Sequence, residues 1–80
     1  MAGRPRAEDD LPEIADLAAR GLTMRAIAEE SGKSYSQVRT RIAALRRGVA
    51  RETGDIAWLE DKTVVETATR WLEIFGSPDG

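Results

Sequence analysis

The 80-residue chain contains no cysteine and no histidine, and aromatic residues make up only 5% of it. These absences exclude disulfides, the usual Cys/His zinc sites and catalysis by a histidine base. No apolar run approaches the ~20 residues that span a membrane, and the N-terminus lacks the apolar segment of a signal peptide. We therefore expect one small cytoplasmic domain with no metal, no cofactor, no small-molecule ligand and no membrane contact.

Nothing in the sequence points to an enzyme. Neighbouring carboxylates such as Asp9 with Asp10 are typical of helix starts and surfaces, the serines have no histidine partner, and no glycine-rich loop could cradle a phosphate. We expect no catalytic residue.

The stretch from Leu22 to Arg47 has the pattern of two short helices joined by a sharp turn. Ala28 is small enough for the second helix to cross it closely, Gly32 can adopt a positive φ in the turn, and Val38 can pack the second helix against the first. This spacing predicts a helix-turn-helix, the arrangement that places a helix in the DNA major groove. A glycine-broken helical hairpin that only completes a core is the alternative.

Capping residues support the two helices. Thr23 is placed to cap the first, and Ser34 with Gln37 forms a capping box for the second.

Charge is unevenly distributed along the chain. No acidic residue interrupts the stretch from residue 33 to 51, which holds six basic residues: Lys33, Arg39, Arg41, Arg46, Arg47 and Arg51. After Arg51 there are seven acidic residues against Lys62 and Arg70, so the net charge of -2 averages two unlike halves. Because phosphate neutralisation depends on local charge, the basic run favours nucleic-acid binding over a merely solvated face.

A helical wheel assigns roles along the second helix of the motif, which would enter the groove by its N-terminal turns. The residues expected near base edges are Ser36, Gln37, Arg39 and Thr40. Those expected near phosphates are Lys33, Ser34, Tyr35, Arg41, Arg46 and Arg47, although Tyr35 could equally be partly packed.

The extreme N-terminus reads Gly3-Arg4-Pro5-Arg6. Proline favours an extended backbone, so Arg4 and Arg6 would project from a narrow ribbon that suits a minor groove. The arginine that precedes the glycine in a full AT-hook core is replaced here by Ala2. We predict an arginine-bearing arm over residues 1–7.

The arm followed by the helix-turn-helix resembles the C-terminal DNA-binding module of serine invertases and resolvases, over roughly residues 3–47. The pattern of Leu22, Thr23, Arg25, Ile27 and Ala28 is also similar to that of LuxR-type regulators. The resemblance implies minor-groove contact by Arg4 and Arg6 and base contact by Ser36 and Thr40. The acidic segment after the arm departs from the invertase pattern, and the chain has no recombinase catalytic domain.

The rest of the chain also reads as helical, which predicts an all-α fold: an arm over 1–7, a DNA-binding unit over 8–48, a C-terminal helical segment over 49–75 and a tail over 76–80. A first helix would begin around Pro12 and stop at Gly21, with Ile14, Leu17 and Ala18 buried. Gly48 would end the third helix.

Beyond Gly48 we expect a connection over 49–54, then a segment capped by Thr53 or Asp55, then a helix that begins with a Thr63/Glu66 capping box. The alternative is a winged form with short strands across 49–65. It is disfavoured because residues 60–62 lack the glycine or asparagine of a tight hairpin.

The last helix carries a broad apolar stripe of Val64, Ala68, Trp71, Leu72 and Phe75. A three-helix DNA-binding unit has no obvious need for it, so we expect a homodimer joined through this stripe. The competing expectation is that the stripe folds back on the first helix and completes the core.

Taken together, these features predict a sequence-specific binder of double-stranded DNA, associated with the nucleoid and acting as a bacterial or phage transcription regulator, most simply a repressor. One alternative is an accessory DNA-architecture factor, such as a recombination directionality factor or a terminase small subunit. Another is a protein-interaction module.

Overall fold

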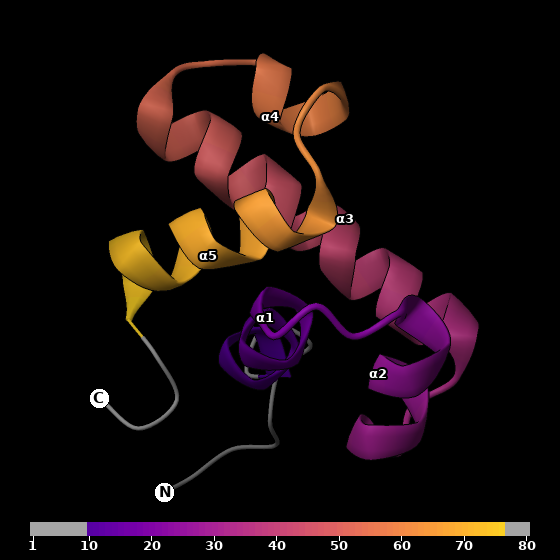
Figure 1. Cartoon of the computed structure of the whole chain (residues 1–80). Helices are drawn as coiled ribbons and strands as arrows, with labels where there is room; N and C mark the ends of the chain where they lie inside the picture. The colour runs from indigo at the N-terminus through magenta and orange to yellow at the C-terminus, as the bar shows by residue number, and fades with distance from the viewer. Residues whose placement is uncertain (1–9, 77–80) are drawn as a thin grey trace, which may run out of the picture.

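The computed structural model describes residues 10–76, which form five helices (Figure 1). In chain order they are α1 (Leu11–Ala19), α2 (Met24–Ser31), α3 (Tyr35–Thr53), α4 (Ala57–Glu60) and α5 (Val64–Phe75). These residues contain no strand, so the expected all-α class is confirmed. The predicted arm, with Arg4 and Arg6, and most of the predicted tail lie outside the described residues.

The first helix follows its prediction closely. Pro12 lies in the first turn of α1, and Gly21 follows the helix with a φ of 90°, a value that glycine adopts without steric cost. Ile14 and Ala18 are fully buried, while Leu17 lies at the edge of the core.

The helix-turn-helix also forms as predicted. The Thr23 hydroxyl accepts a hydrogen bond from the Ala26 N–H at 3.1 Å and caps α2, which ends at Gly32 in the left-handed region with φ of 75°. Ser34 and Gln37 form both hydrogen bonds of the capping box that starts α3. Val38 is fully buried between the helices.

The prediction that the third helix ends at Gly48 is wrong. α3 continues to Thr53 and ends at Gly54, whose φ is 73°. Gly48 is buried within the helix, and a Cβ at this position would lie 3.3 Å from Trp71 Nε1 and 3.5 Å from a Phe75 ring carbon. Glycine costs a helix about 1 kcal/mol, but here it lets α5 approach closely, and packing outweighs propensity.

The C-terminal part is helical, as predicted in outline. The Asp55 carboxylate accepts a hydrogen bond from the Ala57 N–H at 2.9 Å and starts the short α4. The Thr63/Glu66 capping box of α5 is complete, and the hydrogen bond from the Thr63 backbone N–H lowers the pKa of Glu66. Helices occupy residues 49–53 and 57–60, which excludes the winged alternative.

The apolar stripe of α5 lies partly in the core. α5 packs across α1 and α3, as Figure 1 shows, with Ala68 fully buried and Trp71 only 7% exposed. Val64 and Leu72 are partly buried, and Phe75 remains 43% exposed. The stripe therefore folds back onto the protein at Ala68 and Trp71, as the competing expectation had it.

Candidate nucleic-acid interface

The first turns of α3 carry polar side chains that face outward. Tyr35 is 53% exposed, and the predicted base-contacting residues are all exposed as well: Ser36, Gln37, Arg39 and Thr40. Ile27, Val38 and Ile42 hold the opposite side of the helix in the core. The glycine turn and the buried contacts thus present the start of α3 as a protruding surface.

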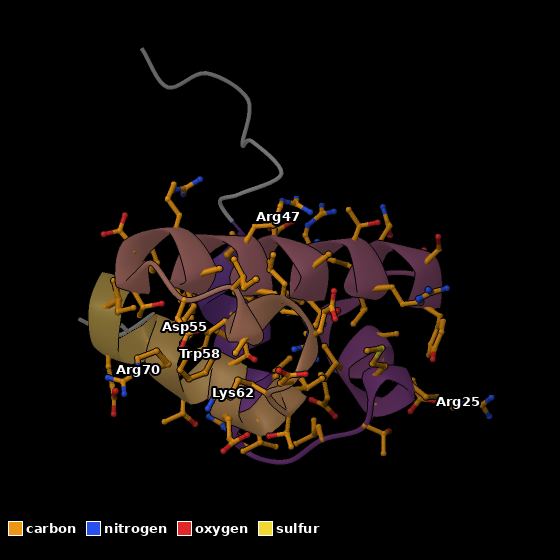
Figure 2. All side chains as sticks on the ribbon, turned by 90° about the horizontal axis from the view of Figure 1, so that it is seen from above. Arg25, Arg47, Asp55, Trp58, Lys62 and Arg70 are labelled. Carbon is orange, nitrogen blue, oxygen red and sulfur yellow. The ribbon has the colours of Figure 1, made fainter. Side chains whose placement is uncertain are left out.

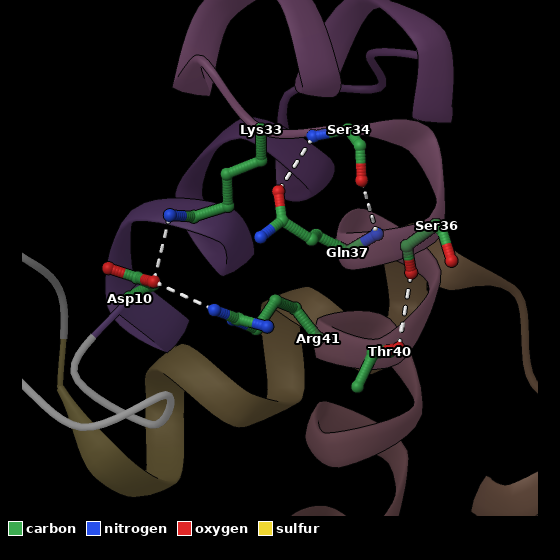
Figure 3. A network of polar contacts seen from close by, with 7 residues as sticks. All are labelled: Asp10, Lys33, Ser34, Ser36, Gln37, Thr40 and Arg41. Atoms are coloured by element: carbon green, nitrogen blue, oxygen red, sulfur yellow. Dashed lines mark hydrogen bonds and ion pairs between the residues drawn. The ribbon is translucent and has the colours of Figure 1, made fainter.

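Local hydrogen bonds already occupy part of this polar surface (Figure 3). Gln37 Oε1 accepts from the Ser34 backbone N–H at 2.9 Å, which leaves the Gln37 amide NH₂ as its outward group. The Thr40 hydroxyl donates to the Ser36 carbonyl at 3.1 Å, which leaves its lone pairs and its methyl group outward. Donors, acceptors and a methyl group are what base edges in a major groove can recognise.

Two of the predicted phosphate contacts have a partner inside the protein. Asp10 Oδ2 lies 2.8 Å from Lys33 Nζ and 3.2 Å from an Arg41 guanidinium nitrogen, and these two basic side chains are only 19% and 15% exposed (Figure 3). The hydrogen bond from Lys33 lowers the pKa of the Asp10 carboxyl, with further help from Arg41. This ion-pair cluster ties the start of α1 to the turn and to α3.

Arg46 is also committed internally. Its guanidinium donates to the Lys62 carbonyl at 2.8 Å, to the Trp58 carbonyl at 3.3 Å and, at the limit of hydrogen bonding, to Thr67 Oγ1 at 3.5 Å. Arg46 therefore fastens α3 to α4 and to the start of α5, so we leave it, with Lys33 and Arg41, out of the DNA contacts proposed below.

Three arginines of α3 remain exposed: Arg39, Arg47 and Arg51. None of them forms an ion pair among residues 10–76. Figure 2 shows Arg47 on the outer side of α3 and Arg70 and Lys62 on the opposite side of the molecule. There, Lys62 and Arg70 stack on Trp58, at 5.1 and 5.9 Å from its ring centre.

The sequence reasoning missed two of the exposed cations. Arg51 stood in the basic run, but a helix ending at Gly48 would have separated it from the outward face. Arg25, in the first turn of α2, lines a hollow together with Tyr35. The signal for Arg25 was its place two residues after the Thr23 cap, which puts it at the start of the motif.

The described residues contain no group of three potential metal ligands. None of the helices in the described part of the chain is long and apolar enough to cross a membrane. In comparisons with known proteins, the chain matches no family model, no curated protein sequence and no solved structure.

Proposed function

We propose that the protein binds double-stranded DNA sequence-specifically, with the start of α3 in the major groove. The observation that carries the proposal is the outward face of α3, where small polar side chains in the first turns are followed by exposed arginines that have no acidic partner among residues 10–76. A helix-turn-helix presents its second helix to DNA in this way.

The roles divide along α3. Ser36, Gln37, Arg39 and Thr40 read base edges, and Arg47 with Ser34 and Tyr35 contacts phosphates. Arg4 and Arg6 enter the adjacent minor groove in this proposal, which for them rests on the sequence alone. A protein that occupies an operator in this way blocks other proteins from it, so we propose a transcription regulator that represses.

A homodimer stays part of the proposal, because one recognition helix reads only a few base pairs. Its surface differs from the predicted stripe, since Ala68 and Trp71 are buried. The large apolar side chains still exposed on the C-terminal helices are Ile56, Leu59, Val65, Ile74 and Phe75. Light scattering of the purified protein measures the mass, and a monomer mass at all concentrations would contradict this part.

Selection of bound fragments from a random pool of double-stranded DNA tests the main proposal. We expect enrichment of one motif, bound with an affinity that falls steeply as salt rises, because each neutralised phosphate releases a counterion. The Arg39→Ala/Arg47→Ala double variant should lose this binding. The single variant Arg70→Ala, on the opposite side, should keep it. A wild-type protein that enriches no motif would contradict the proposal.

A further inference from the structure

A shallow hollow lies beside the outward face of α3. It is formed by the second half of α3, the start of α1 and the end of α5, and its lining includes Leu11, Arg47, Gly48, Arg51, Trp71 and Phe75. None of the described residues that line it is acidic. The hollow exists because α3 continues beyond Gly48, so the sequence reasoning could not find it.

Two guanidinium groups border the hollow. Arg47 and Arg51 are four residues apart on α3, and positions at this spacing lie on the same side of a helix. Both are exposed, and neither has an ion-pair partner among residues 10–76. Like charges at this spacing repel each other, so an anion between them would be stabilised by both.

A third donor comes from the core. Trp71 is only 7% exposed. Its Nε1 is the atom that would lie nearest to a Cβ at Gly48. This N–H forms no hydrogen bond within residues 10–76. Solvent still reaches this nitrogen. Among the described residues, Arg41 Nε is the only side-chain nitrogen or oxygen that is both inaccessible to solvent and without a hydrogen bond. Buried tryptophan N–H groups usually find an acceptor, and none of the described residues supplies one.

We infer that this hollow is a seat for one phosphate of the DNA backbone, bound by Arg47, Arg51 and the indole N–H of Trp71. The inference rests on the proposed function and extends it to two residues, Arg51 and Trp71, outside the predicted phosphate contacts. With three donors and no acidic side chain among the described residues that line it, the hollow suits an anion. Its apolar wall at Phe75 suits the deoxyribose beside the phosphate.

The position along α3 favours the DNA backbone over the bases. At 1.5 Å per residue, Arg47 lies about 10 Å and Arg51 about 16 Å beyond Thr40 along the helix axis. A major groove is about 12 Å wide, so a helix that enters it by its first turns brings Arg51 to the phosphates that border the groove.

Three variants test the seat on a fragment selected by the wild-type protein. Arg51→Ala should weaken binding and flatten the dependence of log K on log salt by about one unit, because one phosphate contact is lost. Trp71→Phe keeps an aromatic ring in the core but removes the N–H donor, and should weaken binding about tenfold with an unchanged salt slope. Arg70→Ala removes the same charge from the opposite side and should leave both quantities unchanged.

Ethylation of single phosphates in the fragment locates the contact. We expect one phosphate outside the base-read positions whose ethylation impairs the wild-type protein and no longer affects Arg51→Ala. Circular dichroism checks that each variant stays helical, and the exposed Arg51 keeps the test decisive even if Trp71→Phe unfolds. If Arg51→Ala has the DNA affinity, the salt slope and the ethylation pattern of the wild type, the hollow does not bind a phosphate. The proposed function would remain in that case. A wild-type protein that selects no DNA would overturn both.

Discussion

Arg46 and Arg47 are neighbours in the sequence, yet their surroundings differ completely. Arg46 donates to two backbone carbonyls of the α4 region and is partly buried, whereas Arg47 is exposed on the outer side of α3 (Figure 2). One step along a helix turns a side chain by about 100°, which moves it from a flank that packs to a face that does not. The comparison teaches that a run of basic residues is not a list of DNA contacts.

The same contrast holds on the other flank. Arg41 is 15% exposed and paired with Asp10, while Arg39, two residues earlier, is exposed and unpaired within residues 10–76. The arginines of α3 thus have two roles. Arg41 and Arg46 bind other elements of the fold, and the exposed arginines make the outer face of the helix positive. Substitution of a fastening arginine should therefore lower the stability of the fold, whereas substitution of an outer arginine should weaken DNA binding.

The largest effect should come from Arg46→Ala. This change leaves the Lys62 and Trp58 carbonyls without their charged donor, and hydrogen bonds to charged groups contribute about 1.5–3 kcal/mol each. We expect the free energy of unfolding to fall by about 3 kcal/mol in urea denaturation. Arg47→Ala is the matched control and should shift it by less than about 0.5 kcal/mol. Equal losses in both variants would remove the distinction between them.

Next in size is the reading of bases by Arg39. Replacement by alanine should reduce discrimination at one or two base pairs of the selected motif by about 2 kcal/mol, the typical value of one bidentate contact. Gln37→Ala should act at a different position, and it also removes one hydrogen bond of the capping box. Repeating the selection with each variant gives the preferences. If both select the wild-type motif unchanged, the reading surface lies elsewhere.

A smaller effect should come from Asp10→Asn, which removes the carboxylate charge between Lys33 and Arg41. We expect a loss of about 1 kcal/mol at pH 7, as for a partly exposed ion pair. Because Lys33 and Arg41 lower the pKa of folded Asp10, its contribution is fully present above the unfolded pKa of about 3.9 and is lost as pH falls through the folded value.

Urea midpoints of the wild type and of Asp10→Asn, measured from pH 7 down to pH 2, check this expectation. The two should differ at pH 7 and converge below about pH 4. A constant difference across the whole range would show that the carboxylate charge does not stabilise the cluster.

The smallest effect should be that of Arg47→Ala on DNA binding. The variant should bind every fragment more weakly by a similar factor and flatten the salt slope by about one unit, since it loses one phosphate contact. Titrations at several salt concentrations measure the slope. A slope identical to that of the wild type would take Arg47 out of the DNA contacts.

Local features of the fold could be predicted from the sequence because their causes lie within a few residues. The Thr23 cap and the two capping boxes each join groups three residues apart, and the Gly32 turn depends on the positive φ that glycine adopts without steric cost. The end of α3 could not be predicted in this way, because Gly48 stays helical through its contact with Trp71, 23 positions later in the chain.

The candidate site likewise has features with local causes and features that depend on residues far along the chain. Exposure of Ser36, Thr40 and Arg47 follows from helix geometry and could be predicted. The internal partners of Arg41 and Arg46 lie 31 and up to 21 residues away in the chain, so only the fold reveals them. The sequence placed Arg46 among the expected phosphate contacts, because it could not show that carbonyl groups of α4 and of the following turn accept hydrogen bonds from it.

The packing of α1 against α5 has a consequence for how the protein is made. The most extensive contacts of α1 are with the last helix, so part of its apolar face stays uncovered until residue 75 has been synthesised. At about 5–20 residues per second, this takes several seconds after α1 has been made. A chain that stops early would contain the whole Leu22–Arg47 motif but lack Ala68 and Trp71, which complete the core. Incomplete chains should therefore stay unfolded and leave the full-length protein without competitors for its binding sites.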